Sequence, residues 1–288
     1  MDDRKTGHYV VGVHTSKGKY KTLHDAIIGT NARAPAGATQ IFTHGPQTVS
    51  MNKIDTDMLK KTSEHIKIYV HEPYPCFIWK GSDEMFKHMM NVFTTADAIG
   101  ASGVVIHLPR ATVETVVTHI VTFLGMLEEA KINVPIILET PSNKPHPTMS
   151  WETPEKLEAL TTLLAATGID NSRVGLCIDT AHVYIAGAQI QTRMDASTWL
   201  KKLPIGWVHL FHLNGNVYQQ GVRFGDKHAI PFASDDQIWG QKNMTYNDSG
   251  CKEFIEYAKC YNIPVIFEGK ATHKNSDVVS FIQICGRV

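Results

Sequence analysis

Short apolar runs and longer amphipathic stretches alternate along the whole chain. A short apolar run is typical of a buried strand, whereas apolar residues three and four positions apart are typical of a helix that covers a core. The apolar runs predict strands at residues 9–14, 39–44, 66–71, 103–107, 135–139, 174–179, 207–212 and 264–268. The stretches after them predict helices at residues 23–33, 55–65, 83–99, 112–130, 154–166, 196–202, 251–261 and 277–285.

One strand is thus followed by one helix eight times, and no linker rich in Pro, Gly or Ser separates these units. Strands that alternate with helices favour a parallel sheet, and eight such units fit a closed barrel better than a doubly wound sheet. We therefore predict an α/β protein, a single (β/α)₈ TIM barrel in which residues 1–288 form one domain.

Every predicted strand ends on a residue that can bind a metal or transfer a proton: His14, His44, His71, His107, Glu139, Asp179, His212 and Glu268. The carboxyl ends of barrel strands converge on one rim, so these side chains are expected to line one bowl. One such histidine alone would more often be an ordinary core residue bonded to a neighbour. The full set favours a metal site at the C-terminal rim.

The segment from Val174 to His182 carries this pattern most sharply, because an apolar run leads directly to Asp179 and His182. Burying a carboxylate and an imidazole is costly unless a partner compensates, and a divalent metal is a common partner. An aspartate that caps a helix and a histidine bonded to a carbonyl would give the same letters, and that alternative stays open here.

The longest irregular segment covers residues 215–246, and a loop of this length in a compact domain is usually functional or disordered. It contains Asp226 and His228, which point the same way if the backbone is extended. Its five aromatic residues favour an ordered lid or a substrate wall.

Composition narrows the class of protein. The 28 basic and 28 acidic residues give a net charge of zero, which argues against a DNA-binding protein that relies on a general positive field. Bound divalent ions would change that balance, because each adds two positive charges.

The five cysteines form no CxxC pair and are read as reduced thiols, and no stretch is long enough for a membrane span. We expect a soluble intracellular monomer of the cytoplasm or nucleus, or of a virion if viral, with neither a membrane nor a protein partner.

The pattern at this point resembles the endonuclease IV family of apurinic/apyrimidinic endonucleases across essentially the whole chain. The matching segments are Cys177 to His182, Ile137 to Pro141, His212 to Asn214 and Asp226 to His228, together with His71, Tyr74, His107 and Glu268. The run from Glu139 to His146 most resembles the viral branch of that family.

The resemblance implies three zinc ions and their ligands. His71, His107 and Glu139 would hold the first ion, Glu139, Asp179, His212 and Glu268 the second, and His182, Asp226 and His228 the third. Glu139 would be the catalytic residue, a bridging ligand that positions a metal-bound hydroxide. The implied activity is hydrolysis of the phosphodiester 5′ to an abasic site in double-stranded DNA, leaving a 3′-hydroxyl and a 5′-deoxyribose phosphate, with 3′-end trimming besides. Imidazole and carboxylate donors suit zinc.

The expected DNA contacts depart from the family pattern more than the ligands do. Gln47 stands where the family commonly has an arginine, Pro75 follows Tyr74 where leucine is usual, and the Gly-Glu-Gly expected near residues 233–235 is absent. We expect Tyr74 and Gln47 to contact DNA, and Lys17, Lys19 and Lys21 to bind phosphates. A solvated turn is the plain alternative for the lysines.

Two other functions remain as alternatives. Glu139, Asp179, His212 and Glu268 alone would also resemble the site of a xylose-isomerase-like sugar isomerase or epimerase. Those enzymes have no use for the further ligands His182, Asp226 and His228, which therefore discriminate between the two. The other alternative is a protein that binds damaged DNA without cutting it. The intact set of ligands argues against this alternative.

Overall fold

The computed structural model describes residues 9–18, 20–32, 36–44, 47, 50, 54–74, 78–222, 227–269 and 275–286. Eight parallel strands close into a barrel in the order β1-β10-β7-β6-β5-β4-β3-β2. They are β1 (Val11–His14), β2 (Ala38–Phe42), β3 (Lys67–His71), β4 (Gly103–His107), β5 (Ile136–Glu139), β6 (Val174–Asp179), β7 (Val208–His212) and β10 (Val265–Phe267). The predicted (β/α)₈ TIM barrel is confirmed; that residues 1–288 form one domain stays a prediction.

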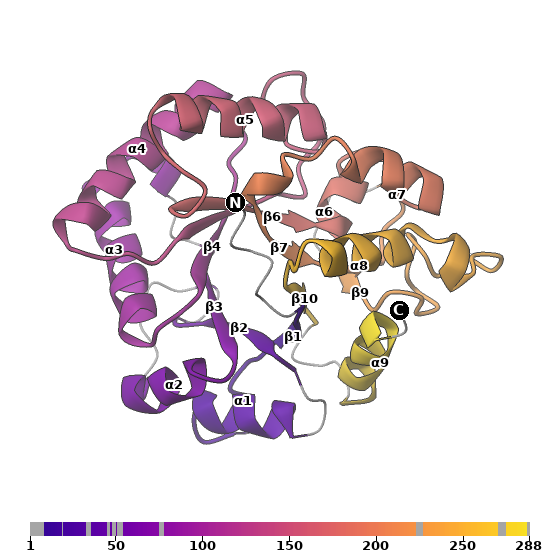
Figure 1. Ribbon diagram of the computed structural model, residues 1–288, viewed down its shortest axis with the longest axis horizontal. Coiled ribbons are helices and arrows are strands. Elements are labelled where there is room, and N and C mark those ends of the chain that lie inside the picture. The colour runs from indigo at the N-terminus through magenta and orange to yellow at the C-terminus, as the bar shows by residue number, and fades with distance from the viewer. Residues whose placement is uncertain are drawn as a thin grey trace.

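Helices surround the strands in a ring (Figure 1). They are α1 (Leu23–Asn31), α2 (Thr56–Ser63), α3 (Asp83–Ala98), α4 (Val113–Glu129), α5 (Pro154–Ala166), α6 (Thr180–Ile185), α7 (Arg193–Leu200), α8 (Gly250–Cys260) and α9 (Asn275–Gly286). Most begin where the sequence supplies a side-chain cap, such as Thr22 before α1 or Ser82 before α3, because that oxygen accepts an otherwise unbonded backbone N–H. No helix in these described ranges is long and apolar enough to cross a membrane.

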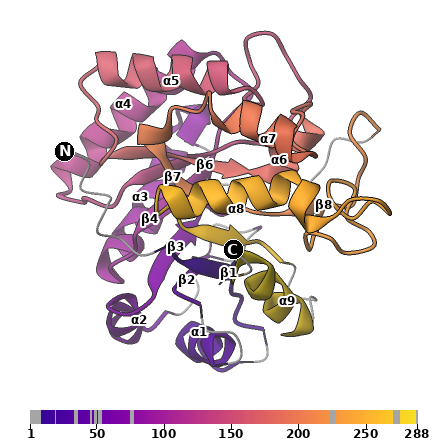
Figure 2. The same ribbon diagram turned by 45° about the vertical axis from the view of Figure 1, so that its right-hand side comes forward.

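Three local predictions need correction. The second strand ends at Phe42 rather than at His44, which lies beyond it with its ring beside the Thr43 hydroxyl. The helix α6 follows β6 without a connecting loop and was not predicted, because six residues are too few to show helical periodicity. The long segment after β7 contains a small antiparallel pair, β8 (Gly215–Asn216) and β9 (His228–Ala229), which lies outside the barrel sheet. Figure 2 shows β8 near the start of α8.

Alternation along the strands divides the barrel interior into an apolar layer and a polar layer. The apolar layer consists of seven buried side chains that pack together: Ala38, Tyr69, Val105, Ile137, Cys177, Leu210 and Ile266. Successive side chains of a strand point to opposite faces, so the residue two positions further along faces inward again. These next residues are Gln40, His71, His107, Glu139, Asp179, His212 and Glu268. The polar layer therefore lies at the carboxyl ends of the strands, on an apolar floor that excludes water.

Candidate metal centre

Three adjoining groups of imidazole and carboxylate side chains occupy the polar layer. The groups are His71, His107 and Glu139; Glu139, Asp179, His212 and Glu268; and Asp179, His182 and His228. Within each group one ligand atom per residue lies within 4.8 Å of the others. Glu139 belongs to the first two groups and Asp179 to the last two, so the three form one continuous site.

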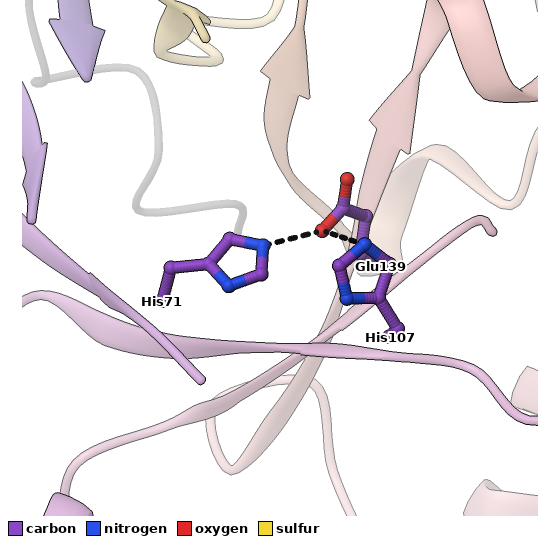
Figure 3. Close-up of side chains that lie close together, drawn as sticks. All are labelled: His71, His107 and Glu139. Carbon is purple, nitrogen blue, oxygen red and sulfur yellow. Dashed lines mark hydrogen bonds and ion pairs between the residues drawn. The ribbon is translucent and has the colours of Figure 1, made fainter. Parts of the chain in front are cut away.

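The first group is built from the ends of β3, β4 and β5. Nε2 of His71 lies 3.1 Å from Oε2 of Glu139, and Nε2 of His107 lies 3.4 Å from the same oxygen. Figure 3 shows the two rings approaching the Glu139 carboxylate from different strands. Register makes this possible, since His107 pairs directly with Glu139 across β4 and β5.

The second group uses the other oxygen of Glu139. Nδ1 of His212 lies 3.0 Å from Oε1 of Glu139, 3.1 Å from Oε2 of Glu268 and 3.8 Å from Oδ2 of Asp179. One imidazole nitrogen therefore faces three carboxylates. Because Glu139 directs Oε2 to the first group and Oε1 to the second, it has the geometry of a bridging ligand.

The third group is built from the end of β6, the helix α6 and the strand β9. Nε2 of His228 lies 3.4 Å from Nε2 of His182 and 3.5 Å from Oδ2 of Asp179. Asp226, which the sequence analysis assigned to this group, lies outside the described residues. Among the described residues, Asp179 completes this group. It also caps α6, since Oδ1 accepts the backbone N–H of His182 at 3.0 Å. Asp179 therefore caps a helix and is also a candidate metal ligand, although the sequence analysis treated these roles as alternatives.

Burial and neighbouring charges act in opposite directions on the pKa values of Glu139 and His71. Burial alone would raise the pKa of Glu139, but His107 and His212 beside it hold that pKa well below its usual range. Burial likewise lowers the pKa of His71, but the hydrogen bond and the charge of Glu139 raise it to about 9. The proton on His71 lies between an imidazole and a carboxylate, which is where a bound cation would lie.

The second nitrogen of each imidazole is also engaged, as expected of metal ligands. Nδ1 of His71, His182 and His228 donates to the backbone carbonyls of Glu72, Thr140 and Glu268, at 2.8, 2.8 and 3.2 Å. Each of these rings, when neutral, then carries its lone pair on Nε2. That nitrogen faces Glu139 in His71 and Asp179 in His228, whereas in His182 it faces Nε2 of His228. Nitrogen and oxygen donors in this arrangement fit a divalent transition metal such as zinc.

A family model described as "Xylose isomerase-like TIM barrel" matches residues 32–241. The chain belongs to this family. The match includes the described candidate ligands from His71 to His228, and Glu268 lies beyond it.

The chain is 29% identical over 246 residues to "Probable AP endonuclease" of African swine fever virus (isolate Tick/South Africa/Pretoriuskop Pr4/1996), covering 81% of this chain and 79% of the relative. It is 26% identical over 236 residues to "Probable endonuclease 4" of Mesomycoplasma hyopneumoniae (strain 7448), covering 76% and 81%. A crystal structure described as "AsfvAP:AG" shares the fold, with a TM-score of 0.81 at 24% identity over 96% of this chain and 97% of that chain. The predicted resemblance to endonuclease IV is confirmed.

Three polar residues of the site were missed from the sequence. Gln40 accepts from Nε2 of His212 at 2.9 Å and donates to Glu268, and Asn214 donates to Oδ2 of Asp179 at 2.7 Å. Glu72 accepts the backbone N–H of His107 at 2.7 Å. Gln40 carried a signal, because it is a polar residue of the predicted second strand on the same face as His44, four positions away.

Among the predicted DNA-contact residues, Tyr74 lies beside the site. Tyr74 is 40% exposed, and its ring centroid lies 6.0 Å from that of His71 and 6.1 Å from that of His107. It therefore lies at the edge of the first group, open to solvent. Gln47, Lys17 and Lys21 are exposed, whereas Lys19 lies outside the described residues. Their DNA contacts stay predictions.

Proposed function

We propose that this protein is a zinc-dependent endonuclease of DNA repair. It hydrolyses the phosphodiester on the 5′ side of an abasic site in duplex DNA, leaves a 3′-hydroxyl and a 5′-deoxyribose phosphate, and trims blocked 3′ ends by the same chemistry. The observation that carries the proposal is the set of three adjoining groups that share Glu139 and Asp179. The names of the viral and bacterial relatives support it.

Three zinc ions are proposed for the three groups. The first two ions take the ligands that the structure groups around Glu139, and the third takes His182, Asp226 and His228, with Asp179 within reach. Each group offers both nitrogen and carboxylate oxygen donors, the set that zinc prefers when it keeps positions open for water or substrate.

When bound, such ions act as Lewis acids on phosphate oxygens and lower the pKa of water. The residues of the chain do the remaining work. Glu139 holds the first two groups at a fixed separation, and the apolar floor below keeps bulk water from the carboxylates. In the reaction a water oxygen bonds to phosphorus while the bond from phosphorus to the 3′-oxygen breaks, and that oxygen takes up a proton. No protein nucleophile is required.

Reaching a phosphodiester inside duplex DNA requires the abasic nucleotide to leave the stack, which costs a few kcal/mol. The exposed ring of Tyr74 at the edge of the first group offers a surface for the bases around the gap. Stacking of this kind contributes roughly 1 to 3 kcal/mol per base.

Family membership alone leaves the sugar isomerase as a rival, as the description "xylose isomerase-like" makes plain. The third group favours the nuclease. His182 and His228 place two further imidazoles beside Asp179, which a site with one or two ions does not need.

The proposal is tested with a labelled duplex that contains one abasic site. Zinc-loaded protein, with no magnesium added, is expected to cut it on the 5′ side and to leave a primer that a DNA polymerase extends. An intact duplex and chelator-stripped protein serve as controls, and elemental analysis is expected to find three zinc ions per chain. Cleavage that needs added magnesium and is absent from zinc-loaded protein would contradict the proposal, as would isomerisation of xylose without cleavage.

A further inference from the structure

Glu72 follows the last residue of β3 and is completely buried, yet none of the three groups includes it. Its Oε1 accepts the backbone N–H of His107 at 2.7 Å and lies 3.3 Å from the ring nitrogen Nδ1 of the same histidine. Its backbone carbonyl accepts Nδ1–H of His71 at 2.8 Å. One residue thus contacts both histidines of the first group, on the sides of the rings that face away from Glu139.

These contacts select the ring nitrogen that each histidine presents to the group. With Nδ1–H of His107 directed at a carboxylate, the neutral ring carries its lone pair on Nε2, which lies 3.4 Å from Oε2 of Glu139. The carbonyl of Glu72 does the same for His71. A wrong tautomer at either ring would present an N–H to a bound cation.

Glu72 occupies this position at a cost. Its Oε2 is buried and accepts no hydrogen bond from the residues that the structure describes. A buried carboxylate oxygen without a donor is destabilising. A cation bound to His107 would attract the carboxylate of Glu72 and offset that cost. The burial of Glu72 is therefore better explained by the first group than by the fold.

We propose that Glu72 is a positioning residue for the first metal ion. Its carboxylate fixes the tautomer and orientation of His107 and makes the ring a stronger donor, as carboxylates behind metal-bound histidines do. The inference rests on the proposed function, because it assumes that His71, His107 and Glu139 hold an ion.

The second group contains a matched comparison. Gln40, also completely buried, accepts from Nε2 of His212 at 2.9 Å and so leaves Nδ1 to face the carboxylates. It provides the same kind of hydrogen bond as Glu72 but without a charge. Gln40 therefore serves the second group in the way that Glu72 serves the first.

The test compares Glu72→Ala, Glu72→Gln and Gln40→Ala with the wild-type protein. Zinc per chain is measured over a range of chelator-buffered zinc concentrations. Glu72→Ala is expected to weaken one of the three sites by about 10- to 100-fold and to leave the other two unchanged. Glu72→Gln should weaken the same site less, because the amide oxygen still accepts both N–H groups. Gln40→Ala should weaken a different site.

Nitrogen NMR of the histidine rings gives a readout that is independent of activity. In Glu72→Ala, His107 is expected to lose its preference for the Nδ1–H tautomer, while the signal of His212 stays as in the wild type. A folded Glu72→Ala protein with wild-type affinity at all sites, or with equal weakening at all three, overturns the inference. If Glu72→Ala does not fold, unchanged affinity in Glu72→Gln overturns it. Wild-type protein that binds no zinc overturns the proposed function itself.

Discussion

Glu139 shows how one residue determines the layout of the site. It is fully buried, its two oxygens face different groups, and it closes a strand whose other inward-facing residue, Ile137, belongs to the apolar floor. A carboxylate in such a place requires compensation, and histidines on three other strands supply it. His71, His107 and His212 each lie within 3.4 Å of one of its oxygens.

Replacing His228 tests the assignment of the third group directly, because this residue belongs to one group only and lies on β9, outside the barrel. His228→Ala is expected to remove about one zinc ion per chain and to lower the incision rate by about 100-fold or more, with the fold retained. Elemental analysis, circular dichroism and the abasic-site assay measure the three effects.

The matched control is His88→Ala, which removes a histidine that pairs with Glu84 on the surface of α3. It should keep the metal content and the activity of the wild type. A folded His228→Ala protein that retains all its zinc would show that the third group is wrongly assigned.

The segment between β7 and α8 shows what holds a long loop in place. Asp236 is buried, and its carboxylate accepts four backbone N–H groups, from Asn216, Phe232, Ile238 and Trp239, at 2.9 to 3.3 Å. These bonds bring together both sides of the β8 and β9 pair. His228 begins β9, so its position in the third group depends on this carboxylate.

Asp236→Asn tests that role. The amide keeps one acceptor oxygen and turns an NH₂ group toward two of the four donors, so we expect a loss of about 1 to 3 kcal/mol in the free energy of unfolding at pH 7. Chemical denaturation of both proteins in the metal-free state measures it. An unchanged free energy would contradict the role of Asp236 in the loop.

The difference in the free energy of unfolding between the wild type and Asp236→Asn is expected to depend on pH. Burial raises the pKa of Asp236 from 3.8 to about 6 in the folded state. The native protein then binds more protons than the unfolded chain between these values, so this residue favours the native state more as the pH falls from 7 to 5, by about 1 kcal/mol. Asp236→Asn cannot titrate here. The stability difference between wild type and variant should therefore widen toward pH 5, and a difference that stays constant would contradict the pKa shift.

The whole molecule has no net charge in its sequence, which is unusual for a protein proposed to bind DNA. Three zinc ions would bring six positive charges to the carboxyl rim, more than the four negative charges of the ligands Glu139, Asp179, Asp226 and Glu268. Attraction to phosphate would then be local to the site, and Tyr74 and the lysines of the first loop are expected to add to it.

These two contributions to DNA binding are separable. Tyr74→Ala is expected to lower the preference for abasic over intact duplex, because stacking at the gap is worth roughly 1 to 3 kcal/mol. Joint replacement of Lys17, Lys19 and Lys21 by Ala should weaken binding to both duplexes equally and flatten the salt dependence, by roughly one unit of slope for each phosphate that a lysine no longer neutralises. Affinity for both duplexes against salt concentration measures each. A triple variant with the wild-type slope would mean that these lysines form only a solvated turn.

The sequence by itself determined the barrel and most of the polar layer. Both follow from local periodicity, because a run of apolar residues marks a buried strand and its last residue lies at the rim whatever its neighbours are. His71, His107, Glu139, Asp179 and His212 could all be placed in this way.

Only the tertiary structure decided which side chains meet. It placed Gln40 rather than His44 in the polar layer, brought Glu72 behind His107 and gave Asp179 a position in two groups. These pairings depend on the register between strands and on the direction of each ring. Such contacts join residues as many as 228 positions apart, as between Gln40 and Glu268, and no periodicity within a single strand records them.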